Sequence, residues 1–360
     1  MKPLLTILAS LFFVSIGFAE DAMKEIKITK EWKINLNSTV ELNAHEQFYK
    51  IEFWDKDFVR IDFIMKTNKS DFTANDMQEM LSINANTTSN KLSINTTIDI
   101  DKSSSIWNWI VKTKDKLTKS CQYEDRSILY LPKNIAQLNL TINYGDLQIG
   151  DINIPLKISS NYSNITIEKN TNKTIISSTY GDVILGNLSN VKINSSYGDF
   201  IIDNIDTLNS NTSYCDIKLT TCPFIQSLST NYGDITIQKV GSIKTTATYS
   251  DIKIKSLQQE LNSVLTYSDL TIDEIAKTLK AITIVSTYSD NKIKVNPENP
   301  INIKIKDVNG DVDIKNSRLQ LNISKNESET ISDITAKTKS ATDASPTIKI
   351  TSKNSDIIIY

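Results

Sequence analysis

Aspartate residues recur at a nearly constant interval through the middle of the chain, and they are the side chains whose spacing best suits chemistry. A row of carboxylates could bind cations such as Ca²⁺ between successive repeats, or it could contact a polysaccharide. The structural alternative is that each carboxylate accepts hydrogen bonds from backbone N–H groups at a bend. The row consists of Asp146, Asp182, Asp199, Asp216, Asp234, Asp251, Asp269 and Asp290, with Asn164 in the same place once.

A tyrosine stands two positions before each member of this row. The tyrosines are Tyr144, Tyr162, Tyr180, Tyr197, Tyr214, Tyr232, Tyr249, Tyr267 and Tyr288. The steps between them are 17 or 18 residues, except for the last, which is 21. A fixed period of this length predicts a solenoid built from repeated coils.

Apolar residues at fixed distances from the tyrosine predict the strands that position it. The third and fifth residues after the tyrosine are almost always Ile, Leu, Val or Phe, and so is the sixth residue before it. A spacing of two places such residues on one face of a strand. A small residue and then Asp follow the tyrosine, which predicts a bend at which glycine tolerates positive φ. The tyrosine stands an even number of positions after the apolar residue that precedes it by six. In a continuous strand the two would share one face, which favours rings stacked inside the coil over an outward aromatic platform.

The repeat extends beyond the tyrosines, and it divides the chain. We predict a signal peptide (1–19), a region of N-terminal strands, one short helix and a cap (20–126), a regular solenoid (127–315), a polar insert or disordered loop (316–346) and a final coil (347–360). Asn309 and Asn354 take the tyrosine position in the last two coils. Phe48 is expected to hold that position in a degenerate first coil. The helix is expected over residues 73–81.

The N-terminus indicates export from the cytoplasm. The apolar run of residues 4–16 ends in Gly17-Phe18-Ala19, which is typical of a secretory signal peptide cleaved after Ala19. No second apolar run is long enough for a transmembrane helix, so an integral membrane protein is not expected. The net charge is −2 with both signs interspersed, which argues against nucleic-acid binding.

Few residues suggest catalysis. His45 is the single histidine, which excludes a metal cluster of several histidines. Its place in a degenerate strand region favours a surface position and argues against a Ser-His-Asp triad, and nucleotide-binding glycine motifs are absent. We therefore expect no enzyme activity and no cofactor. Trp107 and Trp109 are candidate surface contacts, or else they cap the end of the stack. Cys215 and Cys222 either pair or serve as small side chains.

Several segments resemble the bacterial putative adhesin domain family. They are "FWDKDFVRIDF" (53–63), "SILYLPKNIAQLNLTINYGDLQI" (127–149) and the recurring YGD/YSD coils. The resemblance implies a secreted right-handed parallel β-helix at the cell envelope or surface, without a catalytic motif. Together with the repeats it predicts an all-β solenoid of about twelve coils.

The expected function is that of a non-catalytic cell-surface or envelope protein that binds a surface glycan or a protein through an elongated face. The alternatives are a periplasmic structural or envelope-stress component and, more distantly, a polysaccharide-active β-helix enzyme. The sequence leaves the ligand and the oligomeric state open.

Overall fold

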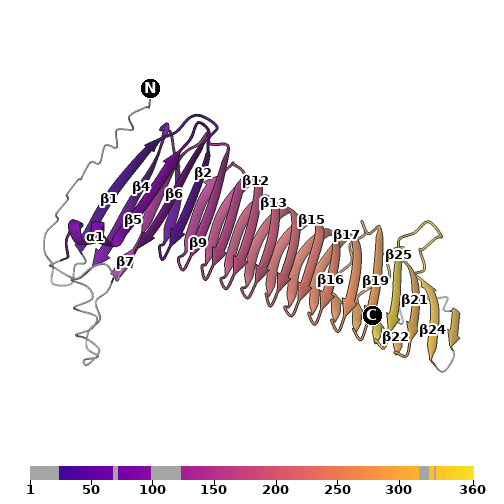
Figure 1. Ribbon diagram of the computed structural model, residues 1–360. Helices are drawn as coiled ribbons and strands as arrows, with labels where there is room; N and C mark the ends of the chain where they lie inside the picture. The colour runs from indigo at the N-terminus through magenta and orange to yellow at the C-terminus, as the bar shows by residue number, and fades with distance from the viewer. Residues whose placement is uncertain (1–23, 68–71, 99–122, 316–323, 328–329) are drawn as a thin grey trace, which may run out of the picture. The chain divides into compact units, whose positions relative to one another are not determined.

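The computed structural model describes residues 24–67, 72–98, 123–315, 324–327 and 330–360. The predicted signal peptide and both Trp107 and Trp109 lie outside these ranges. The described chain is all-β apart from helix α1 (Ala74–Met80), and most of its strands pair in parallel (Figure 1). The all-β fold with stacked parallel strands is confirmed. The chain divides into two compact units, residues 1–172 and 173–360, which we describe in turn.

The described residues of the first unit form eleven complete strands and the start of β12. They are β1 (Lys24–Lys33), β2 (Thr39–His45), β3 (Tyr49–Trp54), β4 (Phe58–Thr67), β5 (Leu81–Thr87), β6 (Lys91–Ile98), β7 (Tyr123–Asp125), β8 (Ser127–Pro132), β9 (Gln137–Asn143), β10 (Leu147–Ile152), β11 (Leu156–Asn161) and β12 (Ile165–Thr179).

These strands form two rows that begin antiparallel and become parallel. One row runs β5-β6-β2-β9-β11, and the other runs β1-β4-β8-β3-β10-β12. Only β5–β6, β1–β4 and β4–β8 are antiparallel within these rows. Antiparallel strands therefore cover the open edge of the parallel coils, where an uncovered edge would invite aggregation.

Helix α1 forms where the sequence predicts it. The Thr73 hydroxyl accepts a hydrogen bond from the N–H of Asp76, and the Asp76 carboxylate accepts one from the N–H of Thr73. This reciprocal capping box satisfies two N–H groups that the helix leaves without a partner. Its residues Met77 and Met80 have buried side chains.

The first coil departs from the sequence alignment. The register pairs Leu147 with Tyr49 and Ile149 with Ile51, so Glu46 and not Phe48 holds the tyrosine position. Glu46 has the positive φ of 60° that marks this position throughout the chain. The prediction for Phe48 was wrong because "QFYKIEF" has apolar residues on both faces of the strand, so alternation does not show which of them face the core.

The second unit contains five long strands followed by shorter ones. They are β13 (Val183–Ser196), β14 (Phe200–Ser213), β15 (Ile217–Asn231), β16 (Ile235–Thr248), β17 (Ile252–Thr266), β18 (Leu270–Ile272), β19 (Ala281–Thr287), β20 (Asn291–Ile293), β21 (Asn302–Val308), β22 (Val312–Ile314), β23 (Ser324–Glu327), β24 (Ile331–Lys337), β25 (Thr347–Lys353) and β26 (Ile357–Ile359).

Each of the strands β13–β17 spans nearly one whole coil and pairs in parallel with the next (Figure 1). The predicted apolar columns are buried, as Phe200 and Ile202 show. A further buried column, which includes Leu188 and Val240, lies eight residues after the tyrosine. In β13 the spacing between buried residues changes from two to three around Leu188, where the strand bends. Burying one such side chain contributes roughly 1.5–3 kcal/mol.

The end of the second unit does not follow chain order. Strand β25 lies between β19 and β21 and is parallel to both, and β26 likewise lies between β20 and β22. Within the predicted polar insert, β24 pairs antiparallel with β21, and β23 pairs with β24. The segment 347–360 is thus an inner coil, and the hairpin β23–β24 covers the outer one.

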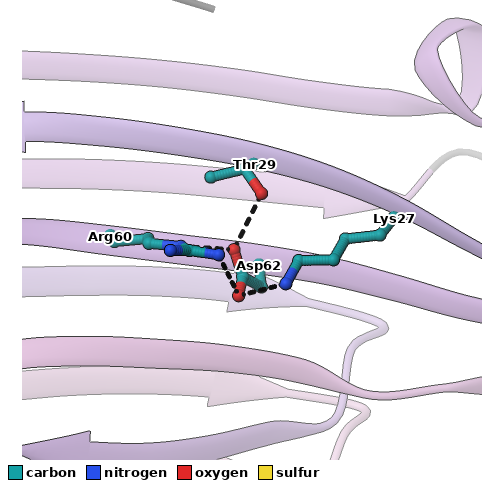
Figure 2. Close-up of polar contacts among 4 residues, drawn as sticks. All are labelled: Lys27, Thr29, Arg60 and Asp62. Atoms are coloured by element: carbon teal, nitrogen blue, oxygen red, sulfur yellow. Dashed lines mark hydrogen bonds and ion pairs between the residues drawn. The ribbon is translucent and has the colours of Figure 1, made fainter. Parts of the chain in front are cut away.

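Asp62 organises the polar contacts of β1 and β4 in the first unit (Figure 2). Its side chain is only 1% exposed. Arg60 donates two hydrogen bonds to the carboxylate at 2.7 and 2.8 Å, Thr29 donates one at 2.8 Å, and Lys27 forms an ion pair at 2.7 Å. Burial alone would raise the pKa of Asp62, but these donors hold it below the ordinary value.

Replacing Asp62 with Asn should destabilise the first unit by about 3 kcal/mol, because it leaves two cations beside a buried site without their carboxylate. The measurement is urea unfolding at pH 7. Asp55 forms an ion pair with Lys133 but is 87% exposed, so Asp55→Asn should change the free energy of unfolding by less than about 1 kcal/mol.

The same pair of variants has a pH signature. Because its folded-state pKa is lowered, Asp62 contributes stability above the ordinary Asp pKa of about 4, and this contribution is lost as the pH falls through the lowered pKa. Asp62→Asn should therefore lose less stability on acidification than the wild type. If the free energy of unfolding fell equally with pH in the variant and the wild type, this role of Asp62 would be contradicted.

Candidate functional site

The tyrosines occupy an unusual backbone conformation. All nine have φ between 51° and 58°, and Asn309 and Asn354 adopt φ of 61° and 51° at the same position. The described glycines, by contrast, have no positive φ. The prediction that glycine supplies the positive φ was wrong, since the tyrosine before it does so. A left-handed conformation costs a residue other than glycine roughly 1–2 kcal/mol.

This conformation also turns the tyrosine side chains outward. Their exposed fractions are 43–53%. The prediction of inward stacking was wrong because it assumed strand alternation up to the tyrosine, whereas a left-handed residue interrupts that alternation. The glycine that follows has a different role: a Cβ on Gly198 would lie 2.1 Å from the carbonyl oxygen of Gly181 on the adjacent coil.

The outward rings form a continuous stack in the second unit. From Tyr180 to Tyr288, neighbouring ring centroids are 4.9–5.0 Å apart and the ring planes differ by 2–8°. In the first unit, Tyr144 and Tyr162 stack at 5.1 Å, and His45 lies 5.4 Å from Tyr144. Because the ring faces cover one another, the stack presents mainly ring edges to solvent.

The aspartate row connects one coil to the next. In the second unit, each Asp Oδ1 accepts a hydrogen bond from the backbone N–H of the aspartate on the following coil. The distances are 2.8–3.2 Å, and the chain of bonds continues from Asp290 to Asp356 and on to Asp311. In the first unit, Asp146 accepts in the same way from Asn164. The carboxylates therefore satisfy backbone donors at the bends.

The remaining carboxylate surface borders a groove. This groove of about 360 Å³ is lined by Asp234, Asp251, Asp269 and Asp290 and by residues two positions after them, which are Thr236, Lys253, Thr271 and Lys292. Burial raises the pKa of Asp269, and the neighbouring carboxylates of Asp251 and Asp290 raise it further against the hydrogen bond from the Asp290 N–H. We call the tyrosines and aspartates of the second unit, together with this groove, the Tyr–Asp edge.

The other residues of interest fall in different places. Cys215 and Cys222 are buried and free, and burial raises the pKa of the Cys222 thiol to about 11. Among the described residues, no three His, Cys, Asp or Glu side chains gather as a metal site, so cation binding by the aspartates stays a prediction. The Asp62 cluster was missed, although an aspartate flanked by Ile61 and Phe63 in an apolar strand was a visible signal.

Comparison with known proteins gives faint likenesses. The sequence matches no model of a known protein family and no curated protein. Among solved structures it is similar to a putative cell adhesion protein from Clostridium sporogenes, at 10% identity over 93% of this chain and 99% of that chain, with a TM-score of 0.23. It is also similar to a putative adhesin from Parabacteroides merdae, at 10% identity over 71% and 95% of the two chains, with a TM-score of 0.40.

A third solved structure is described as a putative lipid binding protein from Parabacteroides distasonis. The identity is 11%, over 93% of this chain and 96% of that one, with a TM-score of 0.31. At these TM-scores the likenesses carry no argument about function. In the part of the chain that the structure describes, no helix is both long and apolar enough to cross a membrane.

Replacing Tyr214 with Asn should cost about 1 kcal/mol of stability. The substitution removes two ring contacts worth roughly 0.5–1.5 kcal/mol each, but asparagine tolerates the left-handed conformation, as Asn309 and Asn354 show. Tyr214→Val should cost roughly 1–2 kcal/mol more, because a β-branched residue is strained there. Urea unfolding measures both, and equal losses would contradict the importance of the backbone conformation.

Asp199→Asn should change the free energy of unfolding by less than about 0.5 kcal/mol, since the amide oxygen can still accept the N–H of Asp216. Asp199→Ala, which removes the acceptor, should cost more. The melting temperature of the wild type should be the same with and without a chelator. A chelator-dependent fall that Asp199→Asn abolishes would instead establish the aspartate row as a cation site.

Proposed function

We propose that this protein is a non-catalytic, secreted cell-envelope or surface protein that binds other macromolecules along the Tyr–Asp edge. The observation that carries the proposal is the exposed row of stacked tyrosines, which stand at a bend that Asn309 and Asn354 form without a ring. Tyrosine is enriched at interfaces because it offers a large contact area and a hydroxyl group at low conformational cost.

The stack is suited to binding because it is already ordered. Ring-on-ring contacts at 4.9–5.0 Å restrict each side chain before any partner arrives. Binding then orders few additional rotamers, which lowers the entropic cost of association. Tyrosine hydroxyls and carboxylates repeat with each coil, which favours a partner with repeated hydroxyl or amino groups, such as a surface glycan or an extended protein segment.

The regularity of the edge also supports a non-catalytic role. Catalysis needs a few groups in unequal environments, with pKa values pushed apart. The aspartates of the second unit instead repeat one hydrogen-bond arrangement from coil to coil. The proposal of secretion rests on the signal-peptide pattern of residues 1–19.

The test compares residues 20–360 with a triple variant in which Tyr197, Tyr214 and Tyr232 are replaced by Asn. Both are fluorescently labelled and applied to arrays of surface glycans and extracellular matrix proteins. The variant should lose about tenfold or more in affinity, equivalent to about 1.4 kcal/mol. Circular dichroism verifies that it remains folded.

The matched control is Phe224→Asn, which removes an exposed ring ten residues beyond Tyr214. The control should bind like the wild type. Equal binding by the triple variant and the wild type would overturn the Tyr–Asp edge as the binding face. Protease treatment of intact cells tests location: loss of the protein supports the surface, whereas protection until the envelope is opened favours the periplasmic alternative.

A further inference from the structure

The second unit holds a cleft where the repeat lengthens. The steps from Tyr267 to Tyr288 and from Tyr288 to Asn309 are both 21 residues, against 17 or 18 in the coils before them. The extra residues form two loops, 273–280 between β18 and β19 and 294–301 between β20 and β21. They lie together and line a cleft of about 820 Å³, which is within the size range of ligand sites.

The loops are anchored to the coils and to each other. The Lys294 N–H donates to the Ile272 carbonyl at 3.0 Å, and the Asp273 N–H donates to the Ile254 carbonyl at 3.0 Å. The Asn299 side-chain amide donates to the Ile275 carbonyl at 2.9 Å, which joins one loop to the other. The cleft is therefore shaped by backbone and amide contacts.

Four lysines line the cleft, together with the carboxylates of Asp273 and Glu274. Lys255 pairs with Asp273 at 2.8 Å, and Lys315 pairs with Asp313 at 3.3 Å. The other two, Lys277 and Lys294, line the cleft and form no ion pair with any described residue. Two cations without partners can meet an anionic ligand without first giving up a protein partner.

Asn299 adds a second, independent feature. It lines the cleft, is 2% exposed, and its Oδ1 atom has no hydrogen-bond partner. A buried acceptor without a donor costs free energy, which a ligand hydroxyl could recover. The apolar side chains of Ala276, Val295 and Pro297 complete the wall.

We infer that this cleft binds an acidic carbohydrate segment. Its carboxylate would lie against Lys277 and Lys294, a hydroxyl would donate to Asn299 Oδ1, and its C–H surface would contact the apolar wall. This chemistry is distinct from that of the Tyr–Asp edge, whose carboxylates would repel such a ligand. The inference does not depend on the proposed function.

The test titrates residues 20–360 with a galacturonate hexamer, with a neutral maltohexaose of the same length, and with inorganic phosphate. The hexamer should bind, and the neutral sugar should not. The double variant Lys277→Gln/Lys294→Gln should lose about tenfold or more in affinity. The triple tyrosine variant should bind the hexamer like the wild type, which separates this cleft from the Tyr–Asp edge.

The matched control is Lys304→Gln/Lys349→Gln, which removes two exposed lysines on β21 and β25 that do not line the cleft. It should bind the hexamer normally. Equal losses in both double variants would show non-specific charge attraction and overturn the inference. Absence of hexamer binding would also overturn it, as would competition by phosphate at the same concentration as the hexamer.

Discussion

The structure depends on the in-register parallel hydrogen bonding between successive coils. In the second unit, the Tyr197 N–H donates to the Ser213 carbonyl, and the Phe200 N–H donates to the Asp216 carbonyl, on either side of one bend. This register converts a repeat in the sequence into rows of identical side chains in space. Coils of 17 and 18 residues coexist because the extra residue is absorbed away from the bend, as the register shift after Leu208 shows.

That register also explains how two unfavourable features are tolerated. Left-handed tyrosines are strained, and aligned aspartates repel one another. Ring stacking offsets part of the first cost, and the bond from each aspartate N–H to the preceding carboxylate offsets part of the second. The ring stacking and the carboxylate hydrogen bonds both form only when neighbouring coils are in register. The bend and the core are therefore expected to fold and unfold together.

Much of the fold could be predicted because the side chains that form the core recur in the sequence as apolar residues at a fixed period. The columns represented by Ile202 and Leu208, helix α1, and the tyrosine position of Asn309 and Asn354 all follow from the sequence. The spacing of the aspartates also reveals them as a candidate site, and bonding to backbone N–H groups is one of three interpretations of the row, beside cations and a polysaccharide.

Other features could not be read from spacing, since each depends on backbone conformation or long-range order. The direction of the tyrosines is set by a positive φ that periodicity does not report. Strand β25 pairs with β19 and β21, although several strands have a similar alternation of apolar and polar residues. The sequence pattern therefore does not show which strands become neighbours. The Asp62 cluster depends on Thr29 of β1, which lies 33 residues away from Asp62 along the chain.

The position of β25 has a consequence for how the chain is completed. As the polypeptide emerges from its N-terminus onward, β19 and β21 appear before the strand that must separate them. The two earlier strands have compatible patterns and could meet prematurely. The antiparallel partner β24 emerges before β25 and occupies one side of β21. The other side of β21 then remains for β25, so the order of synthesis and the order of assembly differ in this part of the second unit.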